Sequence, residues 1–406
     1  MVTLADIQAA AERIAGKVLR SPTSYSANLS ALTGCQIFCK LDSLQMTGSF
    51  KERGARNRLE LIPSDQRAAG VIAASAGNHA LALAYHGHAL NIPVRVVMPV
   101  WAPLIKVENC RRHGAVIVLH GETYDDAKAE ALRQASTSGA LYVPGFDDDA
   151  IIAGQGTLGL ELLNEVADLD AIIVPVGGGG LIAGIGIAVR ALQPHIRVIG
   201  VEPAHAPSAT AALAAGKPVR VETQPTLADG LGVACIGERC WEPLRDTVEQ
   251  VVTVDEAAIA QAVLRLVEHE KAVVEGAAAC ALAAVLRHDL GLRGKRVALV
   301  LCGGNIDPTV LSRVIERGLA ADGRLCRVRA NIIDRPGSLA RFLQIIAQVG
   351  GSVREVRHDR SFAPGDVALV NITCLIETRD HAHCRELEAA FTAAGIRATV
   401  QTSAEN

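Results

Sequence analysis

The sequence predicts an α/β fold, in which doubly wound, mostly parallel sheets are followed by a smaller α+β domain. Short apolar runs alternate with amphipathic helical stretches over most of the chain, which is typical of right-handed β-α-β crossovers. Half of the 406 residues are hydrophobic and only 3% are aromatic. That composition suits buried Val- and Ile-rich strands packed against Ala-rich helices.

The main sheet is predicted from runs that stay apolar from end to end, because parallel strands are buried on both faces. Helical patterns lie between these runs, for example at 127–136 and 255–268. The strands are expected at 36–41, 71–74, 94–98, 115–119, 172–176, 198–201 and 297–301.

A separate small domain is predicted after Gly318–Gly323, which is interpreted as a short linker. Its order of elements, β-α-β-β-α-β, is that of a ferredoxin-like plait. Strands are expected at 326–333, 351–358, 366–377 and 397–401, with helices at 338–349 and 381–394. Two domains are therefore predicted, at 1–320 and 327–406.

Charge and apolar patterning argue against several partners. The 40 basic and 43 acidic residues leave a net charge of −3 without runs of like charge, so neither nucleic acid nor a membrane surface is expected as a partner. The uncharged stretch Ala171–Val189 is long enough to span a bilayer, but four consecutive glycines interrupt it and favour a buried strand, loop and helix. Scattered cysteines and no recognisable secretory leader favour the cytoplasm.

No metal site is predicted. His381, His383 and Cys384 have the residue types of a metal cluster. They fall on an expected polar helix face without matching ligands nearby, which favours a solvated surface.

A lysine follows a Gly-Ser turn in Thr47-Gly48-Ser49-Phe50-Lys51. A helix is expected to begin near Ser49, which places Lys51 at the positive end of the helix dipole and lowers the pKa of its amine. A neutral amine can form an imine and then act as a base. The alternative is a surface lysine in a first helical turn, and this motif alone does not exclude it.

Small residues follow the predicted strand 71–74, in Ser75-Ala76-Gly77-Asn78-His79. A strand, a tight turn and a helix present backbone N–H groups to an anion such as a carboxylate. Asn78 adds a side-chain donor. The alternative is an ordinary turn in which Asn78 caps the helix.

Two glycine-rich turns follow later strands. Gly177–Gly180 allow a phosphate to approach the backbone at a helix N-terminus. The same loop also fits a dinucleotide fingerprint, with Glu202 placed as a ribose-binding acid, so a nicotinamide-dependent oxidoreductase stays open. Cys302 begins Cys302-Gly303-Gly304-Asn305 at the end of strand 297–301, and its alternative is a buried structural cysteine.

Taken in order, these motifs resemble the fold-type II pyridoxal-phosphate enzymes, and among them the threonine dehydratases (threonine ammonia-lyases). The resemblance covers nearly all of residues 1–320 and implies a small subdomain, roughly 40–140, nested in the large one. The motifs that carry it are Thr47–Ala55, Ser75–Ala80, Ile152–Thr157, Val174–Leu181, Leu227–Gly230 and Cys302–Asn305.

The resemblance implies roles for individual residues. Lys51 would form the Schiff base with pyridoxal phosphate and serve as the catalytic base, and Phe50 would pack beside the ring. Asn78 would bind the ring hydroxyl and Cys302 would face the ring nitrogen. The phosphate would be bound by Gly177, Gly178, Gly179, Gly180 and Leu181, and the substrate carboxylate by Ser75, Ala76, Gly77, Asn78 and His79.

The implied reaction is a β-elimination that converts L-threonine to 2-oxobutanoate and ammonia, and L-serine to pyruvate. A neutral thiol at Cys302 is a weak partner for the ring nitrogen, which favours prompt elimination over transamination. Dehydration of serine or 3-hydroxyaspartate is the nearest alternative. A binding protein without activity is a third hypothesis.

The sequence departs from its relatives at several positions. Ala76 replaces the Ser that serves as the second acid in serine racemases, so racemisation is not expected. Leu81 stands where many dehydratases have Gln. Glu202 and Ala206 match two ligands of a cation site in some relatives, but Ser208 replaces the third, and no metal is predicted there.

The tail resembles an ACT regulatory domain through Asp334-Arg335-Pro336-Gly337-Ser338-Leu339. This strand-to-helix turn has free amides suited to an amino-acid effector at an interface between tails. The alternative is a solvated helix start with Pro near its first position. The resemblance also implies a homo-oligomer, either a dimer or a tetramer.

Overall fold

The computed structural model describes residues 1–360 and 368–402. The chain forms two compact units that divide between Ile306 and Asp307. The sequence placed this boundary near residue 320. The two boundaries differ because helix α13 (Pro308–Ala321) belongs to the second unit, whereas the sequence-based boundary placed it in the first.

The larger sheet of the first unit has six strands, and all neighbours are parallel except β1 and β2. β10, which comes last of these six strands in the sequence, lies between β2 and β7 and runs parallel to both, so the carboxyl ends of all three strands lie at the same edge of the sheet. The strands in spatial order are β1 (Thr23–Ser26), β2 (Gln36–Lys40), β10 (Arg296–Val300), β7 (Ala171–Pro175), β8 (Arg197–Pro203) and β9 (Gln250–Val254).

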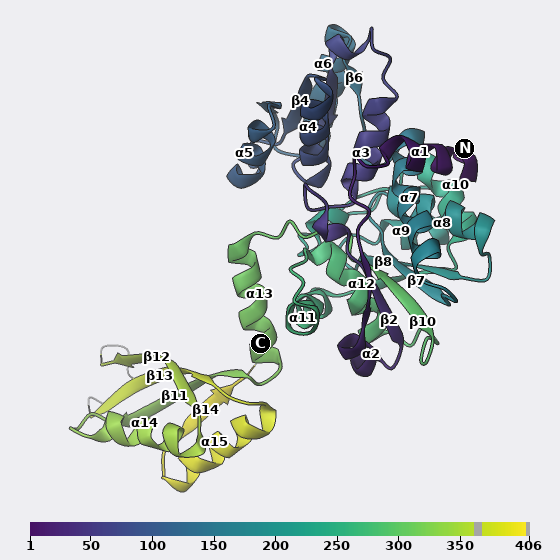
Figure 1. Ribbon diagram of the computed structural model, residues 1–406. Coiled ribbons are helices and arrows are strands. Elements are labelled where there is room, and N and C mark those ends of the chain that lie inside the picture. Colours follow the sequence, from purple (N-terminus) through teal and green to yellow (C-terminus); the bar gives the residue numbers. More distant parts are fainter. Residues whose placement is uncertain (361–367, 403–406) are drawn as a thin grey trace. The chain divides into compact units, whose positions relative to one another are not determined.

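A second, four-stranded parallel sheet is formed by residues that lie between β2 and β7 in the sequence. Its strands and helices form the upper lobe of this unit in Figure 1. Alanines and valines fill its core, as expected for parallel strands covered by helices. The elements are α3 (Lys51–Glu60), β3 (Val71–Ala74), α4 (Asn78–Leu90), β4 (Val94–Met98), α5 (Leu104–Arg112), β5 (Val116–Leu119), α6 (Tyr124–Ser138) and β6 (Leu141–Tyr142).

Small residues allow the helices beside the larger sheet to pack closely. A Cβ at Gly184 of α8 would lie 2.5 Å from the carbonyl oxygen of Ile152 in α7. No helix in residues 1–360 or 368–402 is long and apolar enough to cross a membrane. The helices are α1 (Leu4–Ile14), α2 (Ala27–Thr33), α7 (Asp149–Glu165), α8 (Gly180–Leu192), α9 (Ser208–Ala215), α10 (Glu238–Thr247), α11 (Glu256–Arg265) and α12 (Gly276–Arg287), with short turns η1 (Asp42–Leu44), η2 (Arg67–Ala69), η3 (Asp229–Leu231) and η4 (Leu266–Glu270).

The second unit contains an antiparallel sheet of order β12-β13-β11-β14, which is the strand order of the ferredoxin-like plait. Its core includes the stacked rings of Phe342 and Phe391, with centroids 4.7 Å apart. The elements after α13 are β11 (Leu325–Ile333), α14 (Ser338–Val349), β12 (Ser352–Asp359), β13 (Leu369–Glu377), α15 (His381–Ala393) and β14 (Ala398–Gln401). Residues 366 and 367 of the predicted strand 366–377 lie outside the described residues.

Two interpretations of the sequence are corrected here. The expected linker Gly318–Gly323 consists of the last turn of α13 and the first two residues of the three-residue connection to β11, because Gly318 is buried and continues the helix. The expected solvated surface at His381–Cys384 is wrong for His383 and Cys384, which are both buried. His383 Nε2 lies 2.9 Å from the carbonyl oxygen of Val349, so this side chain has a structural role.

Candidate active site

The turn that carries Lys51 is fixed by the end of β10. The backbone N–H of Phe50 donates to the carbonyl of Cys302 over 2.9 Å, and that of Gly304 donates to the carbonyl of Gly48 over 2.9 Å. Gly48 has φ +75°, and a Cβ there would lie 2.4 Å from the side chain of Asn305. The turn therefore requires glycine at this position.

Lys51 is the first residue of α3, and its side chain is partly buried. Its Nζ donates to the carbonyl of Gly145 over 2.6 Å and lies 5.0 Å from the centroid of the Phe50 ring. Burial lowers the pKa of this amine to about 8, against opposing contributions from Cys240, Cys302 and Glu275. A surface lysine, the alternative interpretation of this motif, is thereby excluded.

Asn78 begins α4, but the helix is capped by Gly77 without a side-chain hydrogen bond. The Asn78 side chain is used in the site: its Nδ2 donates to Glu275 Oε1 over 2.8 Å, and its Oδ1 accepts from Asn305 Nδ2 over 2.9 Å. Asn78 is therefore held in one orientation by two side chains from distant parts of the sequence.

The turn Ser75–His79 lies beside Lys51, but not all of its side chains face outward. His79 is buried, and its Nε2 lies 3.0 Å from the carbonyl oxygen of Val143. Burial, followed by the nearby charge of Lys51, lowers the pKa of His79 to about 3. A neutral His79 then donates through Nε2, and its buried Nδ1 has no hydrogen-bond partner among the described residues.

The glycine loop between β7 and α8 packs tightly against the side chains of Phe146 and Cys240. A Cβ at Gly178 would lie 2.3 Å from the ring of Phe146, and one at Gly179 would lie 2.9 Å from Cβ of Cys240. Gly179 has φ +94° and is the N-cap of α8, and no described side chain caps this helix. The first amides of α8 are thus left to an anion.

Cys302 ends up next to the Lys51 turn, at the carboxyl end of β10. Cys302 is 1% exposed, and burial raises the pKa of its thiol well above the usual value. It therefore stays a neutral, weak hydrogen-bonding group.

Glu275 lies in the candidate site, and the sequence motifs did not point to it. It is buried, its carboxylate touches Asn78, and a Cβ at Gly303 would lie 2.2 Å from its Oε1. Burial raises the pKa of this carboxyl to about 7. The available signal was an isolated glutamate directly before the small, apolar stretch that forms α12.

Gly145 and Phe146 were also missed. The carbonyl of Gly145 accepts from the Lys51 amine, and Phe146 supports the glycine loop. The segment that contains them connects β6 to α7 and has no regular structure, so neither periodicity nor a strand end marks it.

Glu202 does not point to a ligand. Its carboxylate is buried and accepts from the backbone N–H groups of Ala209 and Thr210, each over 2.9 Å. It therefore caps the start of α9, and both of its carboxylate oxygens are engaged there instead of being free to bind a ribose.

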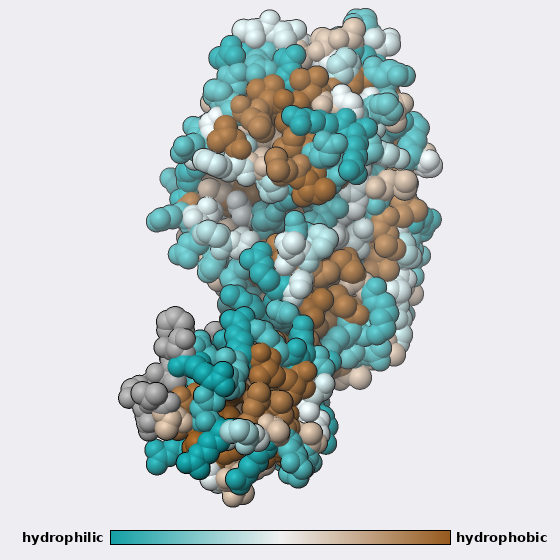
Figure 2. All heavy atoms as spheres, turned by 90° about the vertical axis from the view of Figure 1, so that its left-hand side faces the viewer, coloured by the Kyte–Doolittle hydropathy of each residue, from teal (hydrophilic) through white to brown (hydrophobic). Residues whose placement is uncertain are grey.

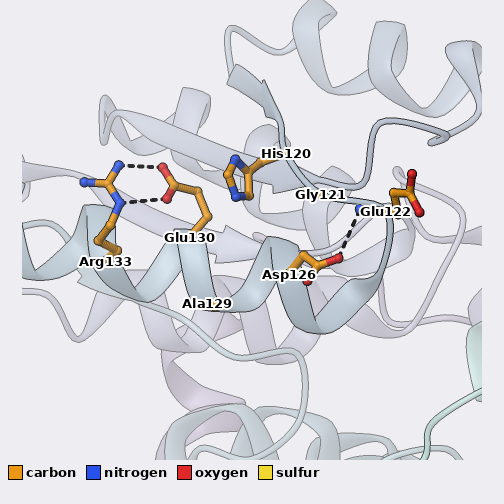
Figure 3. Close-up of a pocket in the computed structure, with 7 residues that line it drawn as sticks. All are labelled: His120, Gly121, Glu122, Asp126, Ala129, Glu130 and Arg133. Atoms are coloured by element: carbon orange, nitrogen blue, oxygen red, sulfur yellow. Dashed lines mark hydrogen bonds and ion pairs between the residues drawn. The ribbon is translucent and has the colours of Figure 1, made fainter.

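Two hollows are lined by residues that do not belong to this site. One, of about 490 Å³, lies along α6, where Asp126, Glu130 and Arg133 follow one another on one helix face below His120 (Figure 3). Glu130 is paired with Arg133 at 2.7 Å and Asp126 accepts backbone N–H groups of its own helix start. Asp126, Glu130 and Arg133 therefore already have partners.

The second hollow, of about 410 Å³, contains the predicted effector turn Arg335–Leu339. Asp334 and Arg360 form an ion pair at 2.6 Å in its wall. Gly337 has φ +89° and is the N-cap of α14, which no described side chain caps. The turn thus offers amides and charges of both signs.

The face of the molecule in Figure 2 carries patches of apolar side chains. Four large hydrophobic residues on the segment after β4 and on the first turn of α5 are more than two-fifths exposed. They are Val100, Trp101, Leu104 and Ile105, with exposures of 43%, 78%, 85% and 50%.

Comparisons with known proteins agree with this arrangement. The model of a family described as pyridoxal-phosphate dependent enzyme matches residues 14–303. The chain is 42% identical to an L-threonine ammonia-lyase of Thermotoga maritima over 97% of the chain and 98% of that protein. Among solved structures, it is similar to threonine deaminase isoform 2 of Solanum lycopersicum (TM-score 0.73, 34% identity, 77% of this chain and 91% of that one) and to maize serine racemase (TM-score 0.74, 34% identity, 79% and 98%).

Proposed function

Because the chain belongs to the family of pyridoxal-phosphate dependent enzymes, we propose that it converts L-threonine to 2-oxobutanoate and ammonia by β-elimination, and L-serine to pyruvate and ammonia. The observation that carries this proposal is the buried Lys51 amine, whose pKa of about 8 gives it a substantial neutral fraction near neutral pH. The resemblance to L-threonine ammonia-lyases over nearly the whole chain supports the choice of substrate.

The residues of the site fit pyridoxal phosphate. The first turn of α8 offers amides without a side-chain cap, which suits the phosphate. Ser49 Oγ is buried without a hydrogen-bond partner in the described part of the chain, as expected of a polar atom beside a polar ligand. We assign the phosphate to Gly177–Leu181, the ring to Phe50, Asn78 and Cys302, and the covalent attachment to Lys51.

Bound pyridoxal phosphate supplies an electron sink that makes the α-proton of an amino acid acidic. Lys51 Nζ then accepts that proton, while Gly145 directs the amine through its carbonyl. Cys302 stays neutral and donates at most weakly, so it does not maintain a positive charge on the ring nitrogen. The β-hydroxyl leaves as water, and hydrolysis of the eliminated product then consumes one water molecule and releases the amino group as ammonia.

We assign the substrate carboxylate to the amides of Ser75–His79. The backbone N–H of Ser75 donates to the carbonyl of Val97 and that of Gly77 donates to Ser75 Oγ. The start of α4 has no side-chain cap, so the amides of Asn78 and His79 are the ones available for the carboxylate. Leu81, one turn further along α4, is packed against the core of the four-stranded sheet.

Two rivals are weaker. Racemisation needs a second proton donor on the opposite face of Cα, and Ala76 provides none. Hydride transfer with a nicotinamide needs an acid for the ribose, and Glu202 is occupied by the start of α9.

We also propose that the second unit binds an amino-acid effector at Arg335–Leu339 and that the enzyme is a homo-oligomer. The hollow at this turn and its uncapped amides support the first part. The exposed apolar residues Val100–Ile105 support the second, because patches of this kind mark contacts between proteins. All ten cysteines are free, which supports a reducing, cytoplasmic location.

The test is 2-oxo-acid formation from threonine, serine and 3-hydroxyaspartate, measured side by side with purified protein. Lys51→Ala is expected to lower the rate by at least a thousandfold, and the exposed Lys217→Ala is the matched control. Wild-type protein that binds no pyridoxal phosphate, or releases no 2-oxo acid from any of the three, contradicts the proposal. D-serine formed faster than pyruvate would favour racemisation instead.

A further inference from the structure

A buried acidic and a buried basic side chain connect the two helices that deliver the site. Lys51 is the first residue of α3 and Asn78 is the first residue of α4. Glu52, the next residue of α3, places its Oε2 3.3 Å from Nε2 of His86 in α4. Both side chains are fully buried, with 0% exposure.

The other carboxylate oxygen of Glu52 is also engaged. Glu52 Oε1 accepts from the backbone N–H of Thr47. This hydrogen bond links Thr47, the first residue of the turn that carries Lys51, to Glu52 at the start of α3. One carboxylate thus contacts the Lys51 turn with one oxygen and α4 with the other.

Burial makes this contact important for both side chains, because a buried polar group that lacks a partner is costly. The 3.3 Å contact is not a hydrogen bond, and neither His86 nitrogen has a hydrogen-bond partner in residues 1–360 or 368–402. The approach of His86 Nε2 to Glu52 Oε2 is therefore the polar contact that links α4 to the buried carboxylate.

The position of His86 makes this contact relevant to the site. His86 lies eight residues after Asn78, about two helical turns along α4. Its ring meets that of Tyr85 edge-on, with centroids 4.9 Å apart, and the neighbouring Leu83 and Ala84 are fully buried. A side chain held in this way is a fixed point against which α3 can be positioned.

We propose that Glu52 and His86 are positioning residues that hold the Lys51 turn in register with α4, so that the Lys51 amine and Asn78 keep their spacing. This inference rests on the proposed function, in which Lys51 and Asn78 act on the same ligand. Neither Glu52 nor His86 touches the reacting atoms. Their effect reaches the site through the turn 47–51 and through α4.

The first test is amide hydrogen exchange of the apoprotein, because it does not depend on activity. Glu52→Leu is expected to raise exchange at Thr47 at least tenfold, and Glu52→Gln, whose amide oxygen can still accept from Thr47, less than threefold. His86→Phe is expected to raise exchange in both turns, 47–51 and 75–79. His88→Phe, at an exposed position of the same helix, is the matched control and should leave both unchanged.

The second test is steady-state kinetics of the holoenzymes at equal cofactor content. His86→Phe and Glu52→Leu are each expected to lower kcat for threonine about tenfold, with KM changed less than twofold, because misplacement of the reacting groups acts on the chemical step. The double variant should lose no more than the worse single variant, since both act through one contact.

The results separate this inference from the proposed function. Unchanged exchange at 47–51 in Glu52→Leu and His86→Phe, or losses of kcat that multiply in the double variant, would overturn the positioning role. Lower thermal stability with wild-type kcat would overturn it as well. A wild-type protein that is inactive on threonine would overturn the proposed function, while the exchange data would still show whether Glu52 and His86 hold the turn.

Discussion

Asn78 and Glu275 are 197 residues apart in the sequence, yet Asn78 Nδ2 donates to Glu275 Oε1 over 2.8 Å. Asn78 comes from the four-stranded sheet region, and Glu275 precedes α12 beside the six-stranded sheet. The hydrogen bond favours the ionised carboxylate, but burial is the larger effect and raises the pKa of Glu275 to about 7. The carboxyl therefore changes its charge near neutral pH.

Glu275→Gln should stabilise the apoprotein above pH 7. The folded pKa is raised above the unfolded value, so ionised Glu275 costs stability that is absent below about pH 4.5 and grows until the pH passes 7. The glutamine oxygen can still accept from Asn78. We expect a gain of at most about 3 kcal/mol at pH 8 and little at pH 5, measured by thermal unfolding. The exposed Glu242→Gln is the control, and a gain that does not vary with pH would contradict the assignment.

Lys51 should react as an unusually acidic amine in the apoprotein. Burial lowers its pKa to about 8, whereas free lysines titrate near about 10.4. Competitive acetylation followed by peptide mass spectrometry should give a midpoint near pH 8 for Lys51 and an ordinary one for the exposed Lys217. Equal midpoints would show that burial does not weaken the charge of Lys51.

Arg53→Met should be strongly destabilising. Arg53 is fully buried and pairs with Asp42 at 2.7 Å and with Glu161 at 2.6 Å. Burial alone would raise the pKa of Asp42, but the Arg53 guanidinium holds it below its usual value. Removing the arginine leaves a buried carboxylate, at a cost of about 3–5 kcal/mol.

The loss of unfolding free energy, measured by chemical denaturation, should be clearly larger for Arg53→Met than for the control Arg58→Met. Arg58 and Asp148 form a partly exposed pair at 3.1 Å, for which a loss of at most about 1 kcal/mol is expected. Similar losses in both variants would contradict the role of the buried pair.

Gly178→Ala should weaken cofactor binding, because the added Cβ would lie 2.3 Å from the ring of Phe146. Overpacking of this kind costs about 1–3 kcal/mol, and the loop or the ring must shift. The affinity of the apoprotein for pyridoxal phosphate, measured by titration, is expected to fall at least tenfold. Adding Phe146→Ala should restore part of the lost affinity, because it removes the ring that the new Cβ meets. If the double variant loses as much binding free energy as the two single variants together, the clash is contradicted.

Arg335→Ala should remove any response to an effector without changing the basal activity. Arg335 belongs to the hollow at the start of α14, and Arg341 on the same helix lies outside it. Isoleucine and valine are to be titrated against the rate with wild type, Arg335→Ala and the control Arg341→Ala. A flat wild-type response to both amino acids would contradict their regulation of the enzyme through this turn.

The elements that the sequence predicts well are those with a strong local signal. The strand 94–98 is confirmed residue for residue as β4, since Pro93 and Pro99 bound its apolar run. The fold class is confirmed, and so are the helix at 338–349 and the strand at 71–74. In contrast, β1 was not predicted, because it is short and largely polar and pairs only with β2 at the sheet edge.

The candidate site follows the same division. Three residues of the site follow strands that the sequence predicts, namely Lys51, Asn78 and Cys302. In the structure all three lie in the candidate active site. Glu275 could not be predicted, since its environment is created by Asn78 and Gly303 only after folding. The Glu52–His86 contact escaped for the same reason, because neither residue stands in an unusual local pattern.

The position of β10 bears on how the enzyme is made in the cell. The middle of the six-stranded sheet is filled by residues 296–300, long after β2 and β7 have left the ribosome. Until then both strands expose unpaired edges, which are prone to join other chains. Most of the catalytic unit must therefore be synthesised before its sheet can close, and a protein truncated before residue 296 should aggregate, whereas one truncated within the second unit need not.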